Sequence, residues 1–107
     1  MLFRSYHGHH DYSMWSYGPV EPVPYPTPAV DTAGIPDCIA DTVLIAPYND
    51  LETTTRIARE ASDELAAIIV EPVQRLVGPR PGFLEGLRAL ADELAFVLIF
   101  EIGRAHV

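Results

Sequence analysis

Apolar and polar positions follow two different periods in the second half of the chain. Short apolar runs occupy residues 42–46, 66–70 and 96–100, which predicts three strands. Between the first two runs, and again over 83–94, apolar residues recur at helical spacing, which predicts two amphipathic helices. Continuous apolar strands alternating with helices are typical of a parallel sheet. The pattern therefore predicts a β-α-β-α-β segment of the α/β class.

The two predicted helices have recognisable ends. Asn49 or Asp50 can cap the first helix, because a short side-chain acceptor bonds the free amides of a first turn. The helical spacing then continues to Leu65. The second helix has one apolar face, made of Phe83, Leu84, Leu87, Leu90, Ala91 and Leu94. Ala95 follows it where positive φ is common, so an alanine there costs about 1 kcal/mol relative to glycine.

The first third of the chain carries little periodic signal. Residues 1–18 are rich in aromatics and histidine, with only a possible strand end at Leu2-Phe3. Residues 19–37 are a proline-rich connector, which cannot form a helix or a central strand because proline has no amide proton and a fixed φ. We expect this loop to cover a site, the alternative being a polyproline ligand for an aromatic groove.

Two or three strands and two helices are too few to cover both faces of a sheet. We therefore expect residues 1–101 to be a piece of a larger α/β domain. The alternative is a small α/β interaction module that folds alone and is not an enzyme. Cooperative unfolding of residues 1–101 would favour the module, and a molten or aggregated state would favour the piece.

Composition excludes several classes of partner. The 107 residues have a net charge of −8, and all seven basic residues are arginine. Such an acidic chain lacks the positive patch that nucleic acid or an anionic membrane requires, so we expect neither as a partner. The sequence has no apolar run of about 18 residues and no signal-peptide pattern. Cys38 is the single cysteine, which excludes an internal disulfide and favours a cytoplasmic location.

Candidate chemistry lies where the predicted strands end. Glu71 and Glu101 each follow an apolar run, and open parallel sheets build sites at the carboxyl ends of their strands. Near the amino terminus, His7, His9 and Asp11 form an H-x-H-x-D pattern of the kind that binds zinc in metal-dependent hydrolases. Tyr12 stands where that signature continues with histidine, and no second ligand set follows. A metal site is therefore the weaker hypothesis.

Three stretches carry a family resemblance. They are Ile-Ile-Val-Glu-Pro-Val at 68–73, Pro-Gly-Phe-Leu-Glu-Gly-Leu-Arg at 81–88, and Leu-Ile-Phe before an acid at 98–101. Together they resemble class III pyridoxal-phosphate aminotransferases, especially the glutamate-1-semialdehyde aminomutase branch. The resemblance implies the large domain of a fold-type I enzyme that acts as a homodimer. It also implies pyridoxal 5′-phosphate as cofactor and amino-group transfer between a small-molecule donor and acceptor.

The resemblance also implies roles for four residues in binding the cofactor. Glu101 stands where the family has the aspartate that holds the ring nitrogen, and its side chain is one methylene longer. Glu71 of the Glu-Pro pair joins the hydrogen-bond network of the site wall. Tyr6, in Tyr-His-Gly, packs against the cofactor ring, with His7 as a polar neighbour. The loop 74–77 departs from the small, glycine-containing loop of the family, so substrate specificity does not transfer.

Two features indicate that the chain as written is inactive. It has no lysine for the Schiff base, and the family's phosphate-binding loop and small domain are missing, so we assign it no catalytic residue. Residues 102–107 match the translation of a sequencing adapter that would also supply the last two bases of codon 101. We therefore expect the gene to encode aspartate where Glu101 stands, the alternative being a natural short C-terminus.

Overall fold

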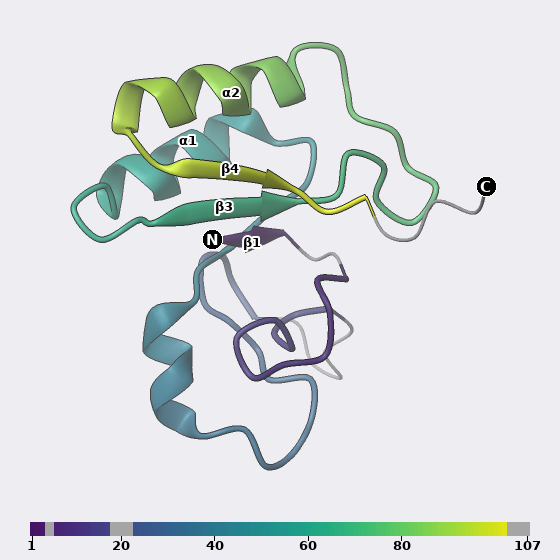
Figure 1. Cartoon of the computed structure of the whole chain (residues 1–107), viewed down its shortest axis with the longest axis vertical. Coiled ribbons are helices and arrows are strands. Elements are labelled where there is room, and N and C mark those ends of the chain that lie inside the picture. Colours follow the sequence, from purple (N-terminus) through teal and green to yellow (C-terminus); the bar gives the residue numbers. More distant parts are fainter. Residues whose placement is uncertain (4–5, 18–22, 103–107) are drawn as a thin grey trace.

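The computed structural model describes residues 1–3, 6–17 and 23–102. Four strands form one sheet in the order β2-β1-β3-β4, and every pair in it is parallel. The strands are β1 (Leu2–Phe3), β2 (Ile45–Ala46), β3 (Ala67–Val70) and β4 (Val97–Phe100). Figure 1 shows β3 and β4 side by side, with their carboxyl ends at the same edge. The predicted α/β class and parallel sheet are confirmed.

The strand β1 lies between β2 and β3. Leu2 is in register with Ile45 on one side and Ile69 on the other, and Phe3 is in register with Ala46. The side chains of Leu2 and Phe3 are buried. The sequence indicated only a possible strand end here, because two residues are too few to display a period. Because β1 lies between β2 and β3 in the sheet, the connection from β2 to β3 crosses over β1.

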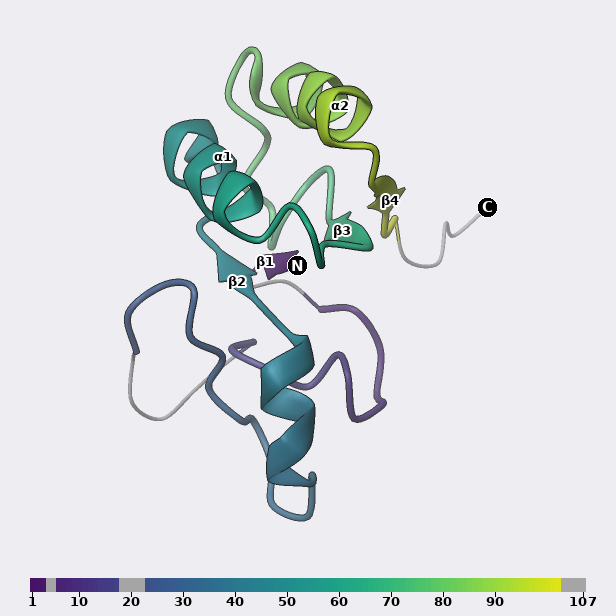
Figure 2. The same cartoon turned by 90° about the vertical axis from the view of Figure 1, so that its left-hand side faces the viewer.

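Two helices cover one face of the sheet (Figure 2). They are α1 (Leu51–Glu60) and α2 (Phe83–Leu94). Asp50 caps α1, since the amide of Thr53 donates to its Oδ1 at 3.0 Å. The predicted continuation to Leu65 is wrong, because α1 ends at Glu60 and residues 61–64 form turns.

The main core lies between these helices and the sheet. Its buried residues are Phe3, Ala46, Ile57, Ala58, Ile68, Val70, Phe83, Leu87, Leu90, Ala91 and Phe96. Four of the six residues of the predicted apolar face of α2 are in this core, and the other two, Leu84 and Leu94, are partly buried against it. The rings of Phe3, Tyr48 and Phe83 meet edge to face, with centroids 5.2 to 6.4 Å apart.

The part of the opposite face that β1 and β2 form is covered by residues from the first half of the chain. Trp15, Ile39 and Val43 pack with Leu2 and Ile45 in a second core (Figure 2). The strand expected at 42–46 is wrong over residues 42–44, because β2 covers only Ile45–Ala46 and Thr42 ends a short 3-10 helix at Asp37–Thr42. The hydroxyl of Thr42 donates to the carbonyl of Ile39 at 2.7 Å, which holds the last turn of that helix.

The strand β4 is exposed, contrary to the expectation of a buried strand. Val97, Ile99 and Phe100 expose 60%, 40% and 45% of their surface. β4 is the last strand in the sheet order, so β3 is its only partner within the residues described. At its start, Ala95 has φ +58°, which confirms the predicted left-handed position. None of the described helices has the length and apolar character to cross a membrane.

Candidate functional site

The carboxyl edge of the sheet brings the four predicted site residues to one region. Tyr6 and His7 follow β1, Glu71 follows β3, and Glu101 follows β4. These strands are neighbours, and all run in the same direction. Their ends therefore meet at the right-hand edge of the sheet in Figure 1. The central position of β1 places the Tyr-His segment next to the acid of β3.

Glu71 is held by the segment after β1. The amide of Tyr6 donates to Oε1 of Glu71 at 2.9 Å, across 65 residues of sequence. Burial raises the pKa of Glu71 above its ordinary value, whereas the bond from Tyr6 and the charge of Arg75 act in the opposite direction. The negative charge of Glu101 also raises the pKa of Glu71, so the two carboxylates are close enough to repel each other electrostatically. Glu71 is thus a fixed, partly desolvated hydrogen-bond acceptor at the carboxyl edge of the sheet.

His7 is buried behind Tyr6, with 8% of its surface exposed. Its Nε2 lies 3.4 Å from the carbonyl oxygen of Phe3, which assigns the proton to Nε2. Nδ1 is buried and has no hydrogen-bond partner among the described residues. Burial lowers the pKa of His7, while the carboxylate of Glu101 acts to raise it. Burial thus favours the neutral imidazole of His7, in which Nδ1 can accept a hydrogen bond.

Two residues that the sequence did not single out complete the region. The ring of Tyr17 meets the ring of Tyr6 edge to face, with centroids 5.7 Å apart. The guanidinium carbon of Arg75 lies 4.4 Å from the centroid of Tyr17. A hollow of about 310 Å³ lies beside these rings, lined by Tyr6, His7, Gly8, His9, Ser13, Met14, Tyr17 and Asp31. The sequence feature that could have indicated Arg75 was the departure of residues 74–77 from the loop of the family.

The H-x-H-x-D side chains are not gathered into a metal site. His7 is buried, whereas His9 and Asp11 are exposed. The backbone carbonyl of Asp11 accepts a hydrogen bond from the indole N–H of Trp15 at 2.6 Å. This bond helps to hold Trp15 in the second core. Over the described ranges, no three histidine, cysteine or acidic side chains come together to hold an ion. The arrangement does not support the hydrolase hypothesis.

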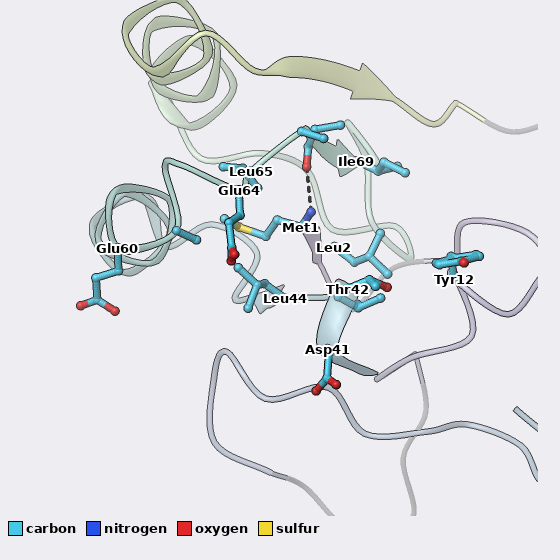
Figure 3. Close-up of a pocket in the computed structure, with 14 residues that line it drawn as sticks. Met1, Leu2, Tyr12, Asp41, Thr42, Leu44, Glu60, Glu64, Leu65 and Ile69 are labelled. Atoms are coloured by element: carbon cyan, nitrogen blue, oxygen red, sulfur yellow. Dashed lines mark hydrogen bonds between the residues drawn. The ribbon is translucent and has the colours of Figure 1, made fainter. Parts of the chain in front are cut away.

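A larger hollow lies at the opposite edge of the sheet, where the strands begin. Its volume is about 600 Å³, its floor is mainly aliphatic, and its rim carries Asp41, Glu60 and Glu64. Figure 3 shows the carboxylates of Asp41 and Glu60 well apart. The amine of Met1 donates a hydrogen bond to the carbonyl oxygen of Ala67 at 2.7 Å. None of the four predicted site residues lines this hollow, so the candidate site is at the carboxyl edge.

Comparison with known proteins gives the chain a family. No protein-family profile matches it. The chain is 44% identical over 105 residues to glutamate-1-semialdehyde 2,1-aminomutase from Roseiflexus castenholzii, and 45% identical over 73 residues to that from Ignicoccus hospitalis. These matches cover 90% and 65% of the chain. The chain belongs to the class III pyridoxal-phosphate aminotransferase family. It spans only 22% and 17% of the length of these two relatives.

Solved structures of this aminotransferase family share the fold. An omega-transaminase from Sphaerobacter thermophilus matches 92% of the chain with a TM-score of 0.84 at 33% identity, over 24% of its own length. A glutamate-1-semialdehyde aminomutase from Pseudomonas aeruginosa matches the same share with a TM-score of 0.67 at 23% identity, over 22% of its length, and so supports the fold alone. The sheet is therefore that of a fold-type I transaminase.

Proposed function

We propose that this chain is the part of a class III aminotransferase or aminomutase that holds the ring of pyridoxal 5′-phosphate. The observation that carries the proposal is the meeting of Tyr6, His7, Glu71 and Glu101 at one edge of the sheet. The family relatives support it, because one solved transaminase has the cofactor bound and one aminomutase structure contains its amine form. The complete enzyme then transfers an amino group between small molecules.

The described residues fit the ring of the cofactor from two sides. Tyr6 exposes 45% of its surface, so its ring is available for stacking. Glu101 is half-buried at the end of β4, where a carboxylate can hold the ring nitrogen in its protonated form. The bound cofactor supplies the electron sink of the chemistry. His7, with its unpartnered buried Nδ1, is a positioning residue beside that carboxylate.

The chain alone does not complete the chemistry in this proposal. It contains no lysine, so a covalent link to the cofactor through a lysine side chain is impossible. We expect pyridoxal phosphate added to the chain, with the amine of Met1 acetylated, to give no Schiff-base absorbance that survives desalting. A stable absorbance would contradict this. The longer enzyme, as a cytoplasmic homodimer, would supply the lysine and the phosphate-binding loop.

Replacement of Glu101 by aspartate tests the proposal. Pyridoxamine 5′-phosphate is a suitable probe because it has no aldehyde to react with the amine of Met1. We expect Glu101→Asp to bind it about tenfold more tightly, since a charge-assisted hydrogen bond placed at the correct distance contributes about 1.5 kcal/mol. The affinity is measured by equilibrium dialysis, and the ¹⁵N shift of the ring nitrogen reports its protonation.

Two further variants make the test specific. Glu93→Asp is the matched control, because Glu93 is exposed on α2, where it pairs with Arg59. Tyr6→Ala should weaken binding through loss of the stacked ring. The proposal fails if the probe shows no saturable binding, or if Glu101→Asp and Glu93→Asp change the affinity equally.

A further inference from the structure

The loop between β3 and α2 carries an exposed apolar tip. Leu76 exposes 98% of its surface, and Val73 and Val77 expose 58% and 55%. Gln74 and Val77 exchange two backbone hydrogen bonds of 2.9 and 2.7 Å, which close a tight turn around Arg75 and Leu76. Both residues of this turn have left-handed φ, +47° and +69°. The turn therefore presents Leu76 outward in a defined conformation, despite the steric cost of left-handed φ for a residue with a Cβ.

The same loop is basic, although the chain as a whole is acidic. Residues 72–82 contain Arg75 and Arg80 and no acid, whereas the net charge of the chain is −8. The other three described arginines each form an ion pair on the helices. Among the residues that the structure describes, Arg75 and Arg80 form none. The apolar tip therefore lies beside two cations that no carboxylate neutralises by direct contact.

The hollow at the amino edge of the sheet has the complementary character. Its volume is about 600 Å³, and aliphatic side chains such as those of Leu2, Leu44 and Leu65 line it (Figure 3). Asp41 and Glu64 on its rim are exposed, and within the described part of the chain neither forms an ion pair. The hollow thus offers an apolar floor and uncompensated negative charge, which suits a ligand that is apolar at its tip and basic beside it.

The tip and the hollow lie at opposite edges of the sheet, so they can meet only between two molecules. The loop follows the carboxyl end of β3 (Figure 1), whereas the hollow lies where the strands begin. At physiological ionic strength, charges more than about 8 Å apart are largely screened. The local attraction between the arginines of the loop and the acids of the rim therefore governs the contact, rather than the net charge of −8 on each copy.

We propose that the amino-edge hollow binds the tip of the β3–α2 loop of a second copy of this chain. Leu76 fills the aliphatic floor, and the arginines of the loop face Asp41 and Glu64. The contact joins two different surfaces, so its repetition gives an open row of molecules rather than a symmetric dimer. A single turn buries little area, so the association is weak, with a dissociation constant of about 100 μM. The inference does not depend on the proposed function, since none of the four candidate cofactor residues takes part.

Analytical ultracentrifugation of the full chain over a concentration series, up to about 1 mM, tests the inference. We expect the average mass to rise steadily with concentration and to pass that of a dimer. Leu76→Asp should weaken the association roughly tenfold or more, because the apolar contact is lost and the new carboxylate meets the acidic rim. Val97→Asp is the matched control, because Val97 exposes 60% of its surface on the edge strand β4. Circular dichroism checks that each variant stays folded.

A mixture of two variants distinguishes this contact from a symmetric one. Leu76→Asp keeps an intact hollow, and Glu64→Arg keeps an intact tip. Each variant alone should associate weakly, whereas the equimolar mixture should form a 1:1 complex with the affinity of the unmodified chain, since one intact tip and one intact hollow remain. A chain that stays monomeric, a mass that levels off at a dimer, or a mixture that associates no better than its components overturns the inference. Equal weakening by Val97→Asp and Leu76→Asp overturns it as well, because it assigns the contact to β4.

Discussion

Replacing Ala95 by glycine should stabilise the chain. Ala95 ends α2 with φ +58° and ψ +43°, and its amide bonds to the carbonyl of Ala91. The left-handed conformation costs an L-residue about 1 to 2 kcal/mol. Glycine avoids that cost but loses about 0.5 to 1 kcal/mol more chain entropy on folding. Ala95 is exposed, so the change sacrifices little packing, and the net gain is about 1 kcal/mol.

Urea unfolding followed by circular dichroism and by the fluorescence of Trp15 measures this change. A gain of about 1 kcal/mol corresponds to a rise in melting temperature of about 4 °C or more for a chain of this size. Ala89→Gly is the matched control, because Ala89 is exposed within α2 and glycine there should cost about 1 kcal/mol. The same chemical change should therefore have opposite signs at two positions. Equal destabilisation by both variants would refute the reasoning.

Three further predictions concern charged groups. Burial lowers the pKa of the Met1 amine from 8.0 to about 6. The free energy of unfolding should therefore rise by about 2 kcal/mol between pH 6 and pH 8, measured by urea denaturation at a series of pH values. Acetylation of the amine should remove this part of the rise. Asp50→Ala should cost about 1 kcal/mol by urea unfolding through loss of the α1 cap, whereas Asp63→Ala, in an exposed turn, should be neutral. Because burial raises the pKa of Glu71 above 4.5, its contribution to stability is present below that pH and lost as pH rises through the folded pKa. Glu71→Gln should lack this dependence, and an unchanged pH profile would contradict it.

The second half of the chain could be predicted well from its sequence. The helix at 83–94, the strands ending at Val70 and Phe100, the cap at Asp50 and the left-handed Ala95 all follow from local patterns. These features depend on side-chain periodicity and backbone preference within about ten residues, which the sequence states directly. Glu71 and Glu101 were predictable as site candidates for the same reason, since each ends a strand.

The first third was not predictable in this way. The strand β1 is two residues long, and its place at the centre of the sheet depends on pairing with residues more than 40 positions away. The short 3-10 helix takes Thr42 from the expected strand, and the hydroxyl of Thr42 donates to the carbonyl of Ile39 in the last turn of that helix. The coverage of the second face by Trp15 and its neighbours also has no periodic signature.

The sequence by itself determined the α/β class, the two helices and the acids at the strand ends, because burial of one face imposes a local period. Only the tertiary structure decided which strands are neighbours, and hence that Tyr6 donates to Glu71 and that Arg75 rests on Tyr17. These contacts join residues 65 and 58 positions apart. Contacts at such separations depend on how the whole chain closes around its core, and no local pattern records that closure.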